Sequence, residues 1–186
     1  SKLSTSASAL SQLSKSKATI ILSLLLIPRK ISILRLYIKN KTTSISGTER
    51  FFSQMDLEKY TDKAKETMVE AMESARALDH QTITTAHVMK AILLNNKKRF
   101  RKLIELVGGN YYWVIQETDK ILISLPRVEG HKNLFIDANL SESIKNAEVY
   151  AKRFGDKFIG LEALFLGIVL GKSEISKKLV KKMKNI

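Results

Sequence analysis

The stretch that comes nearest to a known chemical motif runs from Gly167 to Ser173 and reads GIVLGKS. A phosphate-binding P-loop needs G-x-x-x-x-G-K-[ST] in a loop that joins a strand to a helix. Here the two glycines are one residue too close, and they lie inside and at the end of an apolar helical pattern. We therefore interpret Gly167 as a helix-packing position and Gly171 as a helix stop, and we predict that this segment does not bind ATP.

The side chains that most often bind metals are scattered along the chain. His80, His87 and His131 fall in three different predicted elements and form no H-x-x-x-H or H-E-x-x-H set, which argues against a metal site. His87 is expected to be a hydrogen-bonded structural residue next to an apolar run. The chain has no cysteine, which excludes disulfides, thiolate metal ligands and a cysteine nucleophile.

Three carboxylates at helical spacing are the other candidates for chemistry. Glu66, Glu70 and Glu73 share one helix face and resemble a general acid and base set. Lys63 and Arg76 lie beside them on that face, which favours a solvated, salt-bridged surface. Because no Ser, His and acid arrangement is visible either, an enzyme is the least favoured class of function.

The helices that hold these residues occur twice. Residues 83–93 have the pattern of a buried helix capped by Thr84, and the same design returns at 159–169. The shift from Ile83 to Ile159 is 76 residues, and it also matches apolar positions outside these segments. The matched pairs are Met68 with Ile144, Ala71 with Ala147, Ala75 with Ala151, Leu78 with Phe154, Leu103 with Leu179, and Val107 with Met183. One offset without a gap predicts an internal repeat with a shared core.

Apolar residues at helical spacing define the expected elements of both repeats. They predict helices over about 61–77, 84–94, 97–107, 110–122, 140–154 and 159–169, and from 173 onward. Phe100, Leu103, Ile104 and Val107 should form one buried face. Since no segment shows a strand pattern, the predicted fold class is all-α, with two tandem helical repeats.

We expect repeat one at about 57–124, a Pro- and Gly-marked linker at 125–139, and repeat two at about 140–186. Under the 76-residue shift, Asn110 falls on Ile186. The counterpart of the fourth helix would thus begin where this sequence ends, so we expect the last helix of repeat two to be truncated and the intact protein to continue.

The N-terminal residues differ from the rest in charge. Residues 1–50 hold nine Lys and Arg against one acid, and so carry +8 of the net charge of +14, while residues 51–186 carry +6. The predicted domain is therefore only mildly basic. Its basic runs, 97–102 and 177–184, lie on amphipathic helices and are interpreted as solvent faces. A basic helical nucleic-acid-binding protein is the alternative reading of these runs.

A targeting leader is the favoured interpretation of residues 1–50. The apolar run 20–27 is shorter than the about 20 residues that a membrane span needs, but it has the length of a signal-peptide core. Residues 29–50 are basic and hydroxyl-rich, like a transit peptide. The order is similar to the bipartite leaders of secondary plastids, so we expect a non-globular leader and a plastid-like (apicoplast) location. A mitochondrial presequence or an amphipathic helix packed on the domain are the alternatives.

Short motifs in both repeats are similar to those of one family. Where that family has I-x-x-E-H-L-x-x-A-L, repeat one keeps Ile83, His87, Ala91 and Ile92 but has Ala86 in place of the acid. Repeat two keeps Ile159 and Glu162 but has Ala163 in place of the histidine. The linker 125–130, LPRVEG, resembles L-P-x-V-x-G, and 60–63, YTDK, resembles L-T-x-K/R. The chain thus resembles the N-terminal domain of the Clp/Hsp100 AAA+ chaperones, and the linker is similar to that of the ClpB branch.

This resemblance implies an eight-helix pseudo-twofold domain that binds unfolded or aggregated protein clients, or an adaptor protein. The ATP-driven threading of clients, with its ATP and Mg, would belong to ATPase modules outside this sequence, as would hexamer formation. The fragment itself is expected to hold no enzyme activity, cofactor or metal, and to have no specific nucleic-acid or membrane partner.

The resemblance also implies a client site near the second repeat. Alignment of the motifs places it at Asn146, Tyr150 and Ala163, with Thr61 as a neighbour. Asn146 and Tyr150 lie four residues apart and should share a helix face offset from the core positions. Tyr150 is the only bulky anchor in this set, because the family tends to place larger aliphatic residues at the positions of Asn146 and Ala163.

Overall fold

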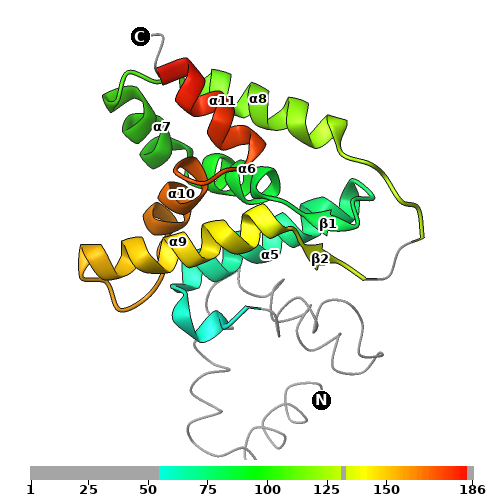
Figure 1. Cartoon of the computed structure of the whole chain (residues 1–186), viewed down its shortest axis with the longest axis horizontal. Coiled ribbons are helices and arrows are strands. Elements are labelled where there is room, and N and C mark those ends of the chain that lie inside the picture. Colours follow the sequence, from blue (N-terminus) through cyan, green and yellow to red (C-terminus); the bar gives the residue numbers. More distant parts are fainter. Residues whose placement is uncertain (1–54, 131–132, 184–186) are drawn as a thin grey trace, which may run out of the picture. The chain divides into compact units, whose positions relative to one another are not determined.

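The computed structural model describes residues 55–130 and 133–183 (Figure 1). The predicted leader and His131 lie outside these residues. In chain order the elements are η1 (Leu57–Lys59), α5 (Asp62–Ala77), β1 (Thr82–Ile83), α6 (Thr85–Asn95), α7 (Lys97–Leu106), α8 (Tyr111–Ser124), β2 (Phe135–Ile136), α9 (Ala138–Phe154), α10 (Leu161–Val169) and α11 (Glu174–Met183). The predicted helical fold is confirmed.

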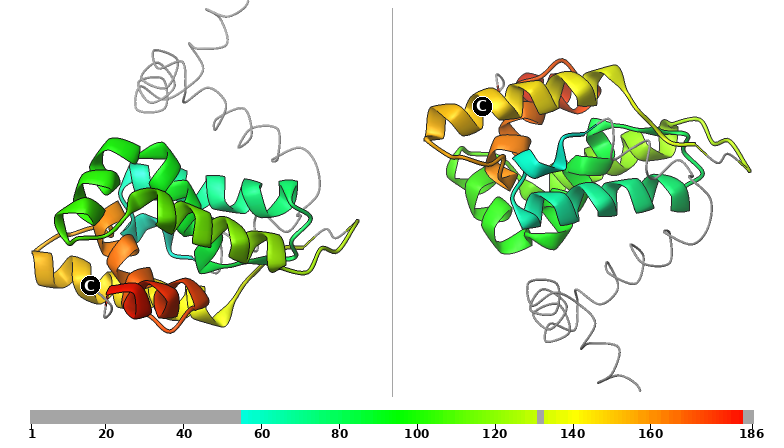
Figure 2. Two further views of the ribbon diagram at one scale, coloured as in Figure 1. Left: turned by 90° about the horizontal axis from the view of Figure 1, so that it is seen from above. Right: turned by 90° about the horizontal axis from the view of Figure 1, so that it is seen from below.

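The 76-residue repeat is visible in the helix boundaries. Shifted by this amount, α5, α6 and α7 fall on α9, α10 and α11 to within about two residues. The matched helices α6 and α10 contact each other in the middle of the bundle, and α8 packs against α6, α7 and α11 (Figures 1 and 2). Repeat one therefore has four α-helices among the described residues, and repeat two has three.

Two short backbone pairings show that the repeats are related by a pseudo-twofold axis. Ile83 pairs with Ile136 in the parallel ladder of β1 and β2, and Tyr60 forms an isolated parallel bridge with Ile159. Ile159 is the repeat equivalent of Ile83, and Tyr60 is the equivalent of Ile136. The second pairing is thus the first one with the repeats exchanged, as a twofold relation requires. These strands were missed by the sequence analysis, since two residues are too few for an alternating pattern.

The helix starts are stabilised by capping side chains. Thr61 accepts a hydrogen bond from the amide of Ala64 at 3.3 Å, and Asn110 accepts one from the amide of Trp113 at 3.0 Å. Asp137 does the same for the amide of Leu140 at 2.8 Å. Each bond satisfies one of the amide groups that a first helical turn leaves unpaired.

The core consists mainly of the matched small and aliphatic residues of the paired helices. Met68, Ala71, Ala75, Ala147 and Ala151 are all at most 3% exposed. α9 and α10 approach each other closely at Gly167, where an added Cβ would lie 2.9 Å from the amide nitrogen of Ala147 and nearer still to the carbonyl oxygen of Ser143. Gly167 is thus a packing position, as predicted.

The predicted core is wrong at one edge of the molecule. Leu103 is 38% exposed, Val107 63% and Phe154 51%, although their spacing placed them on buried faces. Helical spacing identifies the apolar face of a helix but not whether a neighbour covers it. Among the described residues, no helix of repeat two takes the position that α8 takes in repeat one, so this edge stays open.

Candidate functional site

The segment that resembles a P-loop is part of the packed helical core. Gly167 lies within α10, and the amide of Gly171 donates to the carbonyl of Ile168 at 3.1 Å. The hydroxyl of Ser173 lies 2.6 Å from that of Ser176 and is buried. The Gly171 amide and the Ser173 hydroxyl, two groups that would bind phosphate in a P-loop, are therefore engaged in hydrogen bonds at the helix ends.

The two histidines of the described part, His80 and His87, form a buried pair. Nε2 of His87 lies 2.9 Å from Nδ1 of His80, and Nδ1 of His87 accepts the backbone N–H of Thr84 at 3.0 Å. Within residues 55–130 and 133–183 no three His, Asp or Glu side chains are placed to hold a metal ion. His87 is thus the structural residue that was expected, and it takes the place of the usual Glu or Gln in a capping box.

One of the three carboxylates of α5 connects two helices. Glu70 accepts a hydrogen bond from the side-chain amide of Asn95, which ties α5 to α6. Burial, followed by repulsion from Glu66 and Glu73, raises the pKa of Glu70. A raised carboxyl pKa alone does not define an active site, because ion-pair networks and burial raise or lower such values in structural positions too.

Thr61 lies at the junction of the two repeats. Its backbone N–H donates to the carbonyl of Ile159 at 3.0 Å, while its hydroxyl caps α5. The side chain approaches Gly160, where an added Cβ would lie 4.0 Å from Cγ2 of Thr61. Thr61 is half-buried. Its contacts with Ile159 and Gly160 place it next to the start of α10, as the predicted client site requires.

The α9 residues of the predicted site share a face of that helix. Asn146 and Tyr150 are both half-buried, and the guanidinium of Arg153 lies 5.8 Å from the ring centroid of Tyr150. Glu148, on another side of α9, lies 3.8 Å from the ammonium of Lys59, which connects α9 to η1. Tyr150 thus offers an aromatic surface with part of its area open to solvent.

Ala163 does not contribute surface to this site. It is 1% exposed in the first turn of α10, because it occupies the repeat position of the buried His87. Its methyl group packs in the core and is not available to a client in this structure. The predicted client-binding surface is therefore reduced to Thr61, Asn146 and Tyr150, whose role in binding stays a prediction.

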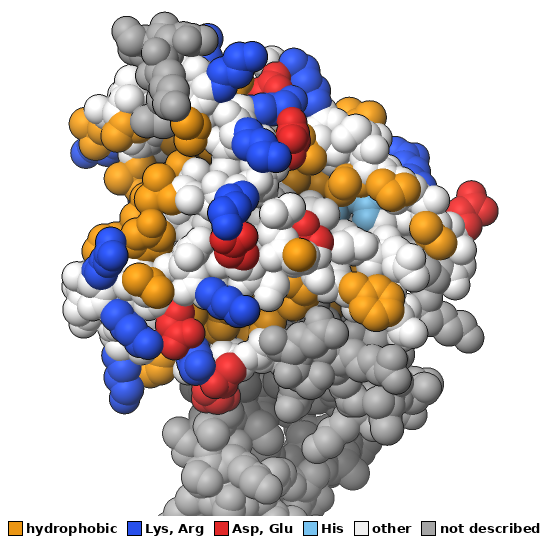
Figure 3. Space-filling view, in the orientation of Figure 1, with side chains coloured by type: hydrophobic (Ala, Val, Ile, Leu, Met, Phe, Trp, Pro, Cys, Tyr) orange, Lys and Arg blue, Asp and Glu red, His pale blue; other side chains and the backbone are white. Residues whose placement is uncertain are grey.

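A second surface was missed by the sequence analysis. An apolar groove of about 670 Å³ lies among α7, the start of α8, α10 and α11, and its floor includes Leu103, Phe165 and Val180. Figure 3 shows hydrophobic side chains gathered along the left edge of the molecule, where Figure 1 places α7 and α10. The sequence held a sign of this groove. Leu103 and Val107 belong to an apolar helix face, and the sequence contained no helix of repeat two that could cover this face.

No helix among the described residues is both long enough and apolar enough to cross a membrane.

Residues 59–183 match the family model of the Clp repeat (R) N-terminal domain. This match covers both repeats and the linker between them, and it therefore includes every α-helix from α5 to α11.

Curated relatives with similar sequences are ClpB chaperones. The chain is 31% identical over 129 residues to the chaperone protein ClpB of Rhizobium meliloti, which is 69% of this chain and 15% of that protein. It is 27% identical over 122 residues to the ClpB of Bacteroides thetaiotaomicron, covering 66% of this chain and 14% of the relative. The chain therefore spans about 15% of the length of the relatives that it matches.

Solved structures with the same fold come from this family too. The Hsp104 N-terminal domain from Candida albicans aligns with a TM-score of 0.58 at 13% identity, over 67% of this chain and 81% of that one. The N-domain of ClpV from Vibrio cholerae aligns with a TM-score of 0.57 at 17% identity, over 67% and 77%. The family match, the internal repeat and the pseudo-twofold helical fold agree, and the chain belongs to the Clp N-terminal domain family, the N-domain of the Clp/Hsp100 chaperones.

Proposed function

We propose that residues 55–183 form a client- or adaptor-binding domain of a ClpB-type chaperone, which docks unfolded or aggregated proteins. The observation that carries this proposal is the face of α9 on which Tyr150 presents a partly exposed ring, with the partly exposed Asn146 one turn before it. An aromatic anchor with polar neighbours suits weak contact with many extended apolar segments.

The relatives support the rest of the proposal. They are named as ClpB chaperones, and this chain spans about 15% of their length. We accordingly propose that ATP and Mg act in ATPase modules outside this sequence, that client threading and disaggregation belong to those modules, and that a hexamer forms only with them. We also propose that residues 1–50 are a leader for plastid-like targeting, with the mitochondrion as the alternative, because their basic, hydroxyl-rich composition is typical of such segments.

The experiment compares two classes of partner on the same protein. An unfolded, fluorescently labelled model client is titrated with the chain at physiological salt, and single-stranded DNA and RNA are tested in parallel by filter binding. The proposal predicts measurable client binding, together with nucleic-acid binding that is weak and falls steeply as salt increases. Nucleic-acid binding that is tight and nearly independent of salt, without client binding, would refute the proposal.

The nucleic-acid alternative has one feature in its favour. Lys97 and Arg101 on α7 both lie within 6 Å of the ring of Tyr112, which combines cations with an exposed aromatic ring. Arg101 is also paired with Glu105 at 2.7 Å, and Arg99 with Glu162, so acids neutralise part of this face. These pairs favour the protein-binding reading.

A further inference from the structure

A second cavity lies between α5 and α6 of repeat one. Glu70, Ser74 and His87 line this cavity, which has a volume of about 250 Å³. The remaining lining residues all belong to α6, and they are Lys90, Ala91, Leu94 and Asn95. When the first three positions are shifted by 76 residues, they fall on Asn146, Tyr150 and Ala163. The cavity is therefore the counterpart in repeat one of the predicted client site of repeat two.

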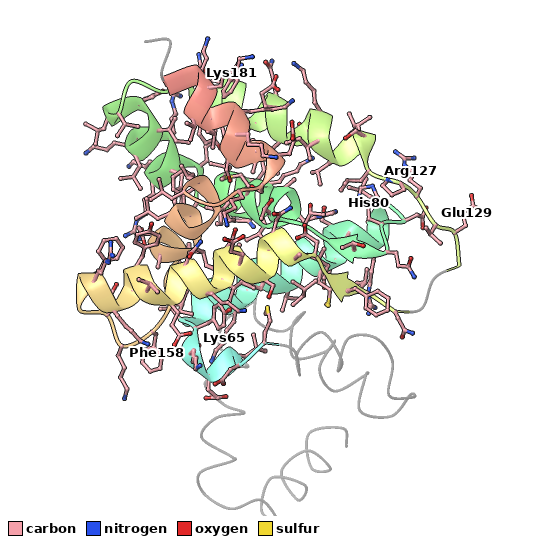
Figure 4. All side chains as sticks on the ribbon, viewed as in Figure 1. Lys65, His80, Arg127, Glu129, Phe158 and Lys181 are labelled. Carbon is pink, nitrogen blue, oxygen red and sulfur yellow. The ribbon has the colours of Figure 1, made fainter. Side chains whose placement is uncertain are left out.

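The walls of the cavity suit an aliphatic chain. Ala91 is 8% exposed and Leu94 is 53% exposed, so apolar surface extends from the interior to the mouth. His87 forms a buried wall, and its hydrogen-bond partner His80 lies at the end of α5 (Figure 4). The volume is below the range of about 300–1,000 Å³ that is typical of sites for drug-sized molecules. The cavity thus has the size for one side chain and is too small for a helix.

The polar groups of the cavity have unused capacity to accept hydrogen bonds. Oε2 of Glu70 accepts a hydrogen bond from the side-chain amide of Asn95, while Oε1 accepts none from a described residue. The hydroxyl of Ser74, one turn later on α5, also has no hydrogen-bond partner within residues 55–130 and 133–183. A carboxylate oxygen and a hydroxyl can both accept from the N–H groups of a cation.

The charges around the cavity favour a cation as its ligand. Lys90, the cation among the lining residues, is paired with Asp119 of α8 at 2.7 Å, and Glu70 has no ion pair among the described residues. Burial, followed by repulsion from Glu66 and Glu73, raises the pKa of Glu70. A cation bound at Oε1 of Glu70 would reduce this repulsion, whereas an anion would increase it.

We propose that this cavity binds the side chain of a lysine or arginine in an extended segment of a partner protein. The aliphatic part of the side chain lies on Ala91 and Leu94, and the cationic end donates to Glu70 and Ser74. Lysine and arginine combine these two features, because an apolar stem carries a charged group at its end.

This site goes beyond the proposed client site, since Thr61, Asn146 and Tyr150 do not line the cavity. Repeat two has the neutral Asn146 at the position of Glu70 and the bulky Tyr150 at the position of Ser74. The two repeats therefore select different side chains at equivalent positions.

The first test compares two peptides that differ only in charge. Short acetylated and amidated peptides with a central arginine, or with the neutral analogue citrulline, are titrated onto isotope-labelled protein, and amide chemical shifts are followed by NMR. The arginine peptide should shift the amides of Ser74, Leu94 and Asn95. It should bind about two- to fivefold more tightly than the citrulline peptide, the range of an exposed ion pair. Equal affinities, or shifts confined to residues outside the cavity, would overturn the proposal.

A free polyamine shares the ammonium group and the aliphatic chain of lysine, so spermidine is titrated in parallel. The peptide should bind more tightly, because its backbone adds contacts at the mouth of the cavity. Tighter binding of spermidine at the same amides would assign the cavity to a polyamine and would overturn a protein partner.

Glu70→Gln removes the charge and keeps an oxygen that can accept from Asn95. This variant should bind the arginine peptide only as tightly as the wild type binds the citrulline peptide. Glu174→Gln on α11 is the matched control, because it changes the net charge equally at an exposed position outside the cavity. If both variants weaken binding to the same degree, the peptide responds only to the overall charge, and the proposed site is wrong.

Ser74→Tyr tests the space in the cavity separately from its charge. It introduces in repeat one the residue that repeat two has at the same position, and it should abolish binding of the arginine peptide although Glu70 is kept. Unchanged binding, with circular dichroism showing a folded variant, would contradict the proposed position of the side chain.

Tyr150→Asp separates this inference from the proposed function. Because Tyr150 does not line the cavity, the variant should still bind the arginine peptide more tightly than the citrulline peptide. An unfolded client without lysine or arginine should bind Glu70→Gln as it binds the wild type. A failure of the client site would thus leave the difference between the two peptides intact, and a failure of the cavity site would leave client binding intact.

Discussion

Nε2 of His87 donates to Nδ1 of His80 across 2.9 Å, in the buried space between the end of α5 and the start of α6. The hydrogen bonds assign this direction, because Nδ1 of His87 already accepts the backbone N–H of Thr84. Burial, followed by the charges of His80 and Lys90, lowers the pKa of His87 to about 4. His87 is therefore neutral at pH 7 in the folded state, and the pair connects the end of α5 to the cap of α6.

This pair predicts a loss of stability in mild acid. In the unfolded chain His87 takes up a proton near its ordinary pKa of 6.5, whereas in the folded protein it does so only near pH 4. The unfolded state thus binds more protons between these values, so the free energy of unfolding should fall as pH decreases from about 6.5 to 4, by on the order of 3 kcal/mol. Urea unfolding at pH 7 and at pH 4.5 measures this difference.

His87→Gln is the control for the acid effect, because Gln can still accept the Thr84 amide but does not titrate. The fall in stability between pH 7 and pH 4.5 should be smaller in this variant than in the wild type. An unchanged fall would mean that other groups cause the acid sensitivity.

Gly167→Ala should destabilise the fold through overpacking. The added methyl group would lie 2.9 Å from the backbone nitrogen of Ala147, which cannot move without shifting α9. We expect a loss of about 1–3 kcal/mol in the free energy of unfolding. Gly160→Ala is the matched control, since its Cβ would meet its nearest neighbour at an ordinary 3.7 Å. If the two substitutions cost the same, α9 and α10 do not pack as closely as described.

Ile92→Ala should be costly because Ile92 is fully buried on the central helix α6. The expected loss is about 2–5 kcal/mol, from lost apolar burial and the remaining cavity. Leu94→Ala, on the same helix but at a position 53% exposed, should cost less than about 1 kcal/mol. Chemical denaturation of the two variants makes the comparison, and a small loss in Ile92→Ala would contradict a core centred on α6 and α10.

The sequence predicted the fold well because the repeat applies to nearly every helix. A single 76-residue shift, together with apolar residues at helical spacing, located the helix starts to within about two residues. The two-residue strands could not be predicted from the sequence, because they form only through backbone pairing between the two repeats. Tyr60 and Ile159 lie 99 positions apart in the numbering and share no local signal.

The binding surfaces were predicted less well, because exposure depends on neighbours that periodicity does not reveal. Asn146 and Tyr150 share a face as their spacing indicated, but Ala163 is buried as the counterpart of His87. Leu103 and Phe154 have the spacing of core residues, yet they lie at an uncovered edge. The sequence held one sign of this uncovered edge. Repeat one has a fourth helix, α8, and repeat two has no equivalent of it among the described residues.

The most direct measurement of the central claim is the affinity of an unfolded model client for the wild type, Tyr150→Asp and Tyr112→Asp. Tyr112 is a 50% exposed tyrosine on α8, away from the predicted client surface, so it controls for the loss of any surface aromatic ring. A charge placed among the apolar contacts of a client at Tyr150 should weaken binding about tenfold or more, whereas Tyr112→Asp should bind like the wild type. Equal affinities for all three folded proteins would contradict a client site at Tyr150.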